Sequence, residues 1–313
     1  MGVYTLEQIN GITFEPFARK GVFADPGAME SLRMMKERTE ATHVIFAPAG
    51  LQETPQSEEI DYRGDRSLGD EELSNMISFA HAIGLKVILK PTVNCKNGVW
   101  RAFINFFDNE VPCEPKWRNW FASHEQFQLH YARLAQKTGC CMFITGCEMV
   151  MAQRRDAEWR ELIAKVREVF DGPVSYNTDK YQEEHVSWWD CVDVISSSGY
   201  YPFGSWEHEL DRIEGVVKRF EKPFFFAETG CMSVKGSGQV PNDWELSGEA
   251  DENEQAAWYE EMFSHTKQRS WVGGYGLWDW PADLRLTTEK GYSFYNKRAE
   301  AVIRSSYEKT EIE

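Results

Sequence analysis

The segment MFITGCEM, residues 142–149, decides the fold, and FFFAETGC, residues 224–231, repeats its pattern. Each is a short run of apolar residues that ends in a glutamate, Glu148 in the first and Glu228 in the second. Near-continuous apolar runs are typical of parallel strands that are buried on both faces. Other runs of this kind occur along the whole chain. They are Gly11–Phe17, His43–Pro48, Leu85–Thr92, Pro173–Thr178, Val192–Ser198 and Gly273–Trp278.

Amphipathic stretches separate most of these runs. Asp25 followed by Pro26 is typical of a helix N-terminus, with an N-cap residue before a first-turn proline. The stretch 70–83 places Leu73, Met76 and Ala80 on one helical face. The further stretches that we expect to be helical are Glu158–Phe170, Trp206–Phe220, Glu252–Thr266 and Tyr295–Tyr307, with a short one near Tyr181–Trp188.

Eight strands that alternate with helices predict an α/β protein, a single (β/α)8 TIM barrel with residues 1–313 as one domain. A doubly wound open sheet is the alternative. That fold would want a glycine-rich phosphate-binding turn after the first strand, and GITFEP, residues 11–16, is not one.

Composition and charge exclude some classes of binding partner for this protein. The 313 residues carry a formal net charge of -16, which argues against nucleic acid, and no apolar run is long enough for a membrane span. The seven cysteines form no C-x-x-C pair, so we expect no metal and no cofactor. Because the N-terminus lacks the features of a signal peptide, we expect a cytoplasmic monomer, or a secreted one if a signal has been removed.

Three long connections follow predicted strands and therefore lie at the carboxyl face of the barrel, where such folds build their sites. They are Ala49–Ser67, Val93–Arg118 and Cys231–Asp251. The second is rich in aromatic residues and the third contains Trp244, which favours a carbohydrate cleft.

Glu148 and Glu228 end the fourth and seventh strands, which lie across the barrel from each other. Hydrolysis of a glycosidic bond needs two such carboxyl groups. One protonates the leaving oxygen, and the other attacks the anomeric carbon or activates water. The pair therefore predicts a glycoside hydrolase.

Glutamates at the ends of strands four and seven are typical of clan A glycoside hydrolases, which this chain resembles along its whole length. It is most similar to glycoside hydrolase family 113, the β-mannanases. The segments that carry the resemblance are GITFEPFA (11–18), ILKPTVNCKNGVWRAFI (88–104), ITGCEM (144–149), FFFAETG (224–230) and GYGLWDWP (274–281).

This resemblance implies a retaining enzyme that cleaves β-1,4-mannosidic bonds in mannan or mannooligosaccharides by double displacement. It implies that Glu148 is the acid/base, that Glu228 is the nucleophile and that Tyr200 orients the nucleophile. Trp278 matches the tryptophan that floors the subsite of the reacting sugar. Cys147 stands where many clan members have an asparagine that binds the sugar 2-hydroxyl, so another residue must hold that group.

Besides Trp278 and Cys147, further candidates for substrate binding cluster at strand ends. Lys90, Asn94, Trp100 and Arg101 lie at and just after the third strand, and weaker candidates are Asn177, Asp179, Asp279, Trp280 and Glu15.

Competing functions remain open at this point. Another clan A activity, such as that of a β-xylanase, β-galactanase or exo-β-mannosidase, fits the same carboxylates, and so does an inactive carbohydrate-binding barrel. A serine hydrolase would need a G-x-S-x-G turn, which the sequence lacks.

Overall fold

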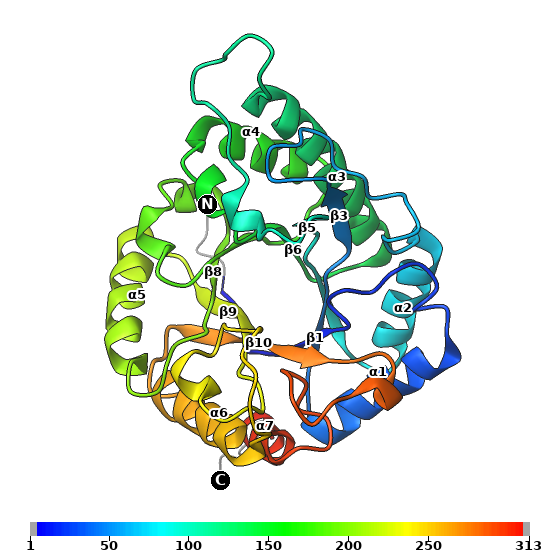
Figure 1. Ribbon diagram of the computed structural model, residues 1–313, viewed down its shortest axis with the longest axis vertical. Helices are drawn as coiled ribbons and strands as arrows, with labels where there is room; N and C mark the ends of the chain where they lie inside the picture. Colours follow the sequence, from blue (N-terminus) through cyan, green and yellow to red (C-terminus); the bar gives the residue numbers. More distant parts are fainter. Residues whose placement is uncertain (1–4, 309–313) are drawn as a thin grey trace.

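The computed structural model describes residues 5–308, and eight parallel strands close into a barrel in the order β1-β10-β9-β8-β7-β6-β4-β2 (Figure 1). The predicted (β/α)8 class is confirmed, and every predicted apolar run overlaps a barrel strand. These strands are β1 (Ile9–Phe14), β2 (His43–Phe46), β4 (Lys86–Leu89), β6 (Met142–Cys147), β7 (Val174–Thr178), β8 (Val194–Ser198), β9 (Phe224–Thr229) and β10 (Val272–Trp280).

Seven α-helices surround the barrel in the described part of the chain. They are α1 (Pro26–Thr39), α2 (Asp70–Ala82), α3 (Trp117–Thr138), α4 (Asp156–Arg167), α5 (Trp206–Phe220), α6 (Glu252–Thr266) and α7 (Arg298–Tyr307). Within residues 5–308, no helix combines the length and apolarity that crossing a membrane requires.

Two connections differ from the sequence-based expectation. The helix expected near Tyr181–Trp188 is only a pair of short 3-10 turns, η3 (Glu183–His185) and η4 (Trp189–Cys191), and buried Trp188 and Trp189 cover the barrel there. The long helix α3 was not among the predicted stretches. Its buried face is largely aromatic and includes Trp120, Phe127 and Tyr131.

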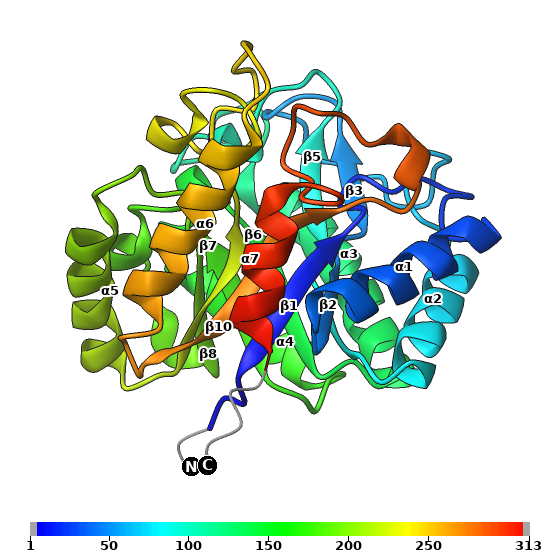
Figure 2. The same ribbon diagram turned by 90° about the horizontal axis from the view of Figure 1, so that it is seen from below.

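Two barrel strands continue past a break at a proline. Pro48 separates β2 from β3 (Ala49–Gln52), and Pro91 separates β4 from β5 (Thr92–Cys95). Proline has no N–H to donate to a ladder, so the strands bend there. Beyond the bend, β3 and β5 pair with each other as a separate two-stranded sheet at the rim of the barrel (Figure 2).

The barrel interior changes character along its axis. Below the carboxyl ends of the strands, the barrel interior holds an apolar cluster that includes Ile45, Ile88, Ile144 and Phe225. A larger apolar cluster fills the layer between the strands and the helices. At the carboxyl ends of the strands the buried inward side chains are instead charged or polar, and they form the site described below. This division is the usual one for a (β/α)8 barrel.

The seam between β1 and β10 gives a test of this packing. Gly274 pairs with Ile9 at a φ of 136°, and a Cβ added there would lie 2.1 Å from the Ile9 carbonyl oxygen. Gly274→Ala should therefore lower the free energy of unfolding by more than ~3 kcal/mol, measured by urea denaturation. The control is Gly215→Ala in α5, where nothing lies within 4 Å of the added Cβ and a gain of ~0.5–1 kcal/mol is expected. Equal stabilities of the two variants would contradict this packing.

Candidate active site

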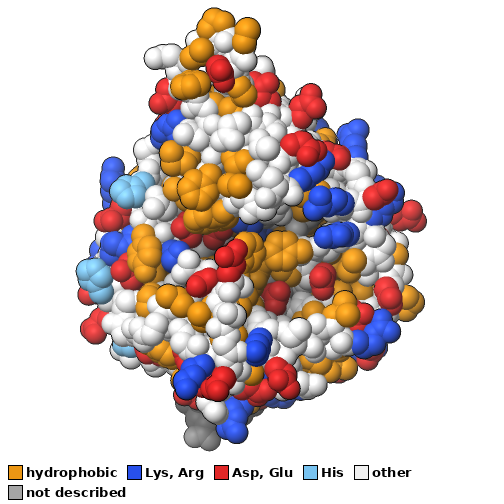
Figure 3. All heavy atoms as spheres, in the orientation of Figure 1, with side chains coloured by type: hydrophobic (Ala, Val, Ile, Leu, Met, Phe, Trp, Pro, Cys, Tyr) orange, Lys and Arg blue, Asp and Glu red, His pale blue; other side chains and the backbone are white. Residues whose placement is uncertain are grey.

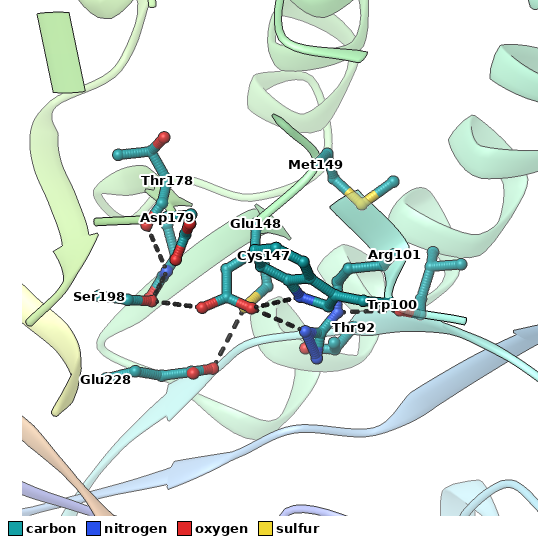
Figure 4. A network of polar contacts seen from close by, with 12 residues as sticks. Thr92, Trp100, Arg101, Cys147, Glu148, Met149, Thr178, Asp179, Ser198 and Glu228 are labelled. Carbon is teal, nitrogen blue, oxygen red and sulfur yellow. Dashed lines mark hydrogen bonds and ion pairs between the residues drawn. The ribbon is translucent and has the colours of Figure 1, made fainter. Parts of the chain in front are cut away.

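Glu148 and Glu228 meet at the carboxyl end of the barrel. Glu148 directly follows β6 and Glu228 lies near the end of β9, and the two residues are 6% and 4% exposed. One carboxylate oxygen from each and the sulfur of Cys147 all lie within 4.8 Å of one another (Figure 4). The structure thus brings together the two glutamates that the sequence singles out.

Glu148 is held by four neighbours. Its backbone has a φ of 51°, a rare left-handed conformation for a non-glycine residue, and its N–H donates to the Asn177 carbonyl oxygen at 2.7 Å. Its Oε2 accepts from Trp100 Nε1 at 3.1 Å and from Arg101 Nη1 at 2.9 Å. Ser198 Oγ contacts Oε1 at 2.7 Å (Figure 4). These contacts fix both oxygens of the carboxyl group.

Glu228 is surrounded by three donors. Its Oε1 accepts from Lys90 Nζ at 2.5 Å and from Cys147 Sγ at 3.2 Å, and its Oε2 accepts from Tyr200 Oη at 3.3 Å. Burial alone would raise the pKa of Glu228, but the charges of Lys90 and Arg101 outweigh burial and hold that pKa below its usual value. Glu228 is therefore ionised at neutral pH, as a nucleophile must be.

The neighbours Cys147 and Tyr200 act as neutral donors. Burial, and then the negative charge of Glu228, raise the pKa of the Cys147 thiol and of the Tyr200 hydroxyl well above their ordinary values. Both groups therefore keep their protons and can donate them in hydrogen bonds to the Glu228 carboxylate.

A metal ion could in principle contact Cys147, Glu148 and Glu228 together, because their ligand atoms lie close enough. However, Lys90 already pairs with Glu228 and Arg101 with Glu148. Two fixed positive charges beside the same carboxylates oppose the entry of a cation. The donor set therefore fits the two ion pairs better than a metal centre.

A cleft of about 360 Å³ opens above the carboxylates, and Figure 3 shows this face of the molecule hollowed near its centre. One wall is aromatic. The Phe17 ring lies 5.8 Å from the Trp278 ring and 6.4 Å from that of Trp244, which is 61% exposed. Exposed rings in a cleft suit the apolar faces of sugars. The remaining lining residues are Trp100, Arg101, Glu148, Asp179, Lys180, Tyr200, Glu228, Asn242, Asp243, Glu245 and Tyr292.

The candidates for substrate binding fall into three groups. Trp278, Trp100 and Arg101 line the cleft. Lys90 and Cys147 are completely buried beneath it, where both contact Glu228 and leave no surface for a sugar.

The third group lies outside the cleft wall. Asn177 is buried and donates to Ser198 Oγ at 3.0 Å, so it supports a residue that contacts Glu148. Trp280 is buried and donates to Ser31 Oγ at 3.0 Å. Asn94 lies in β5 and is not among the residues that line the cleft.

The two weakest candidates also take structural positions. Glu15 accepts a hydrogen bond from the Ala282 N–H at 2.7 Å and so ties the end of β1 to the segment after β10. Asp279 lies beside it, and burial, followed by the charge of Glu15, raises the pKa of Asp279 to about 7. Neither residue lines the cleft.

Several residues of the site were missed by sequence reasoning. Ser198 ends β8 and contacts Glu148, and its place at a strand end was the signal that could have found it. Phe17 ended the first predicted apolar run and could have been found in the same way, whereas Lys180 and Tyr292 come from loops without such a signal. Trp244 was visible only as one aromatic residue in a long connection.

The model of the family described as Glycoside Hydrolase Family 113 matches residues 12–297. A solved GH113 beta-1,4-mannanase is 53% identical, with 96% of this chain and 99% of that one covered and a TM-score of 0.94. The GH113 beta-mannanase from Alicyclobacillus acidocaldarius, solved in complex with ManMIm, is 41% identical, with 98% and 99% covered and a TM-score of 0.93. Among curated proteins, none matches this chain.

A more distant likeness extends to a β-glucuronidase from Ruminococcus gnavus. It is 15% identical, with 96% of this chain and 50% of that one covered and a TM-score of 0.64. At this identity the likeness shows a shared barrel fold and nothing about the reaction.

Asp179 gives a pH-dependent test of the site. It lines the cleft, is 7% exposed, and has a pKa raised to about 8 by burial and then by the charge of Glu148. In the unfolded chain its pKa is ~3.9, so the unfolded state gives up this proton first as pH rises. The contribution of Asp179 to folding therefore becomes unfavourable between pH ~4 and ~8.

Asp179→Asn stays neutral and should escape this cost. Its free energy of unfolding should exceed that of the parent protein by up to ~5 kcal/mol above pH ~8, with no difference near pH ~4. Urea denaturation across this pH range measures the effect. The matched variant Asp190→Asn should show no gain, because Arg160 at the surface lowers the pKa of Asp190. A pH-independent difference for Asp179→Asn would refute the raised pKa.

Proposed function

This chain belongs to glycoside hydrolase family 113, and from that membership and the paired carboxylates we propose that it is a retaining endo-β-1,4-mannanase. Its substrate is β-mannan or mannooligosaccharide. Glu228 acts as nucleophile and Glu148 as general acid and then general base. The relative named beta-1,4-mannanase, at 53% identity over nearly the whole chain, supports the bond type, and the relative named beta-mannanase, at 41% identity, supports the substrate.

The spacing of the two carboxylates is the observation that carries the mechanism. Retaining glycosidases hold them about 5–5.5 Å apart, whereas inverting enzymes leave about 6.5–9.5 Å for a water molecule between the second carboxylate and the sugar. Here oxygens of Glu148 and Glu228 lie within 4.8 Å. This spacing lies on the retaining side of that division, which supports Glu228 as the group that attacks the anomeric carbon.

The contacts of the two glutamates support different roles. Glu228 accepts hydrogen bonds from Lys90, Cys147 and Tyr200 and has a lowered pKa, which keeps it ionised for attack. Glu148 lines the cleft beside Trp100, where it can reach a leaving oxygen. Trp278 lines the cleft with its ring 5.6 Å from Lys90 Nζ, so a sugar on this ring lies close to the nucleophile.

Exposed aromatic rings on two sides of the carboxylates support cleavage within a chain. Trp244 and Phe17 extend the wall from Trp278. Beside Glu148, Trp100 lines the cleft, and its ring centroid lies 6.1 Å from that of Phe103, which is 58% exposed. A cleft with a stacking surface on both sides of the scissile bond suits internal bonds, whereas an exo-acting enzyme would close one side.

Product analysis tests the substrate. The protein should release short oligosaccharides from β-mannan and from mannohexaose, and proton NMR should detect the β-anomer first. The reactions contain EDTA, because the ion pairs leave the carboxylates no need of a metal. Xylan and galactan should be cleaved at least ~100-fold more slowly, a difference of about 3 kcal/mol in transition-state stabilisation.

Other outcomes separate the alternatives. Faster cleavage of xylooligosaccharides or galactan would replace the mannanase assignment by another clan A activity. Release of mannose alone would indicate an exo-β-mannosidase. Binding without turnover would indicate an inactive carbohydrate-binding barrel.

Azide distinguishes the roles of the two glutamates. Glu148→Ala should still be glycosylated by an activated aryl mannoside, which needs no proton, and azide should restore turnover with a β-glycosyl azide as product. Glu228→Ala should lose ordinary hydrolysis by at least ~10⁴-fold with every substrate, because the nucleophile is gone. The opposite result would be that azide restores turnover of Glu228→Ala with an α-glycosyl azide as product, while the rate of Glu148→Ala does not depend on the leaving group. In that case the two roles would be reversed.

A further inference from the structure

Each catalytic carboxylate has its own buried cation. Lys90 Nζ contacts Glu228 Oε1 at 2.5 Å, and Arg101 Nη1 contacts Glu148 Oε2 at 2.9 Å. The Lys90 side chain is fully buried and that of Arg101 is 9% exposed. In so dry a place an ion pair is weakly screened, and loss of one member leaves the other as an unpaired buried charge.

The two cations are also fixed by contacts that do not involve the glutamates. Lys90 Nζ donates to the Ala227 carbonyl oxygen at 3.3 Å and lies 5.6 Å from the centre of the Trp278 ring. Arg101 Nε donates to the Val93 carbonyl oxygen at 3.0 Å. Both cations can therefore stay in place while the carboxyl groups beside them change charge.

The two steps of the reaction move one negative charge between the glutamates. In the first step the Glu148 proton goes to the leaving oxygen, whose bond to the anomeric carbon breaks as a Glu228 oxygen bonds to that carbon. The negative charge leaves Glu228 and appears on Glu148. In the second step Glu148 takes a proton from water, the water oxygen bonds to the carbon, and the ester bond breaks to return the Glu228 carboxylate.

We propose that Lys90 and Arg101 are alternating counter-ions, Lys90 for Glu228 in the free enzyme and Arg101 for Glu148 in the covalent glycosyl-enzyme. This rests on the proposed function, because it needs the covalent intermediate. Lys90 and Arg101 then act through the glutamates, as positioning residues. The lowered pKa of Glu228 in spite of burial agrees with the first half of the proposal.

The proposal predicts different defects for the two cations. With an activated aryl leaving group, formation of the intermediate does not depend on Glu148, whereas its hydrolysis needs Glu148 ionised as a base. Loss of Arg101 should therefore slow the second step much more than the first, which Arg101 affects only through its charge near Glu228. Loss of Lys90 should impair the nucleophile and slow the first step whatever the leaving group.

The experiment uses the full chain and dinitrophenyl β-mannobioside. Arg101→Met should lower kcat by roughly 10- to 100-fold with a clearly smaller loss of kcat/KM. The glycosyl-enzyme should accumulate by intact-mass spectrometry, and azide should restore turnover. Lys90→Met should lower kcat/KM by a similar factor, with neither accumulation nor rescue. Equal losses of kcat and kcat/KM in Arg101→Met, without an accumulated intermediate, would overturn the proposal.

Further variants separate charge from packing. Arg101→Gln keeps N–H donors without the charge and should behave as Arg101→Met does, whereas Arg101→Lys keeps the charge and should recover part of kcat. Arg212→Met removes a partly buried arginine from the buried Glu183, which lies outside the cleft lining, and should lower stability without accumulation of the intermediate. Wild-type protein that does not cleave the aryl mannobioside would refute the proposed function itself. Wild-type cleavage without a defect specific to Arg101 would refute only this inference.

Discussion

The constraint on which the site depends is the repulsion between two carboxylates placed within 4.8 Å of each other in a nearly dry barrel mouth. At an effective dielectric constant of ~20, two negative charges at that distance repel by roughly 3 kcal/mol. The cost of desolvating each carboxylate adds to this repulsion. Lys90 and Arg101 offset this repulsion, since each contacts one carboxylate. The site therefore holds two positive charges for two acidic groups. That balance lets Glu228 be ionised in a place where burial alone would keep it protonated.

The fold supplies the two cations from one region. Lys90 follows β4 and Arg101 follows β5, on either side of the break at Pro91. The break ends the barrel strand just past Lys90, which keeps this side chain inside the barrel, and it directs the chain to the rim, where η1 (Arg101–Phe103) begins beside Glu148. The pairing of β3 with β5 stabilises that rim segment. A local proline pattern thus positions both charges on which the carboxylates depend.

Most of the fold could be predicted from the sequence because each barrel strand is an apolar run, and burial on both faces permits little else. The helix α3 was missed because most of its buried face is built of aromatic and polar residues, His124 and Gln128 among them, and few of its buried residues are aliphatic. Strand ends also located Glu148 and Glu228. Which cation pairs with which glutamate could not be read in this way, because it depends on the left-handed backbone at Glu148 and on a loop conformation. Lys90 and Cys147 were expected to contact the substrate, but both are buried beneath the cleft. The position of a residue in the sequence indicates at which end of the barrel it lies, but not how deeply its side chain is buried.

The position of Lys90 changes the role that we assign to Cys147. An asparagine at this position would offer a stronger donor, and a cysteine there suggests a lost contact to the sugar. In the structure the thiol is completely buried and donates to the same Glu228 oxygen that Lys90 contacts. Because burial keeps the thiol neutral, it adds a weak donor without a further charge. The charge of Lys90 is the dominant interaction at that oxygen, and a stronger neutral donor beside it would add little. The substitution therefore changes the surroundings of the nucleophile, while the sugar hydroxyls are left to the residues that line the cleft.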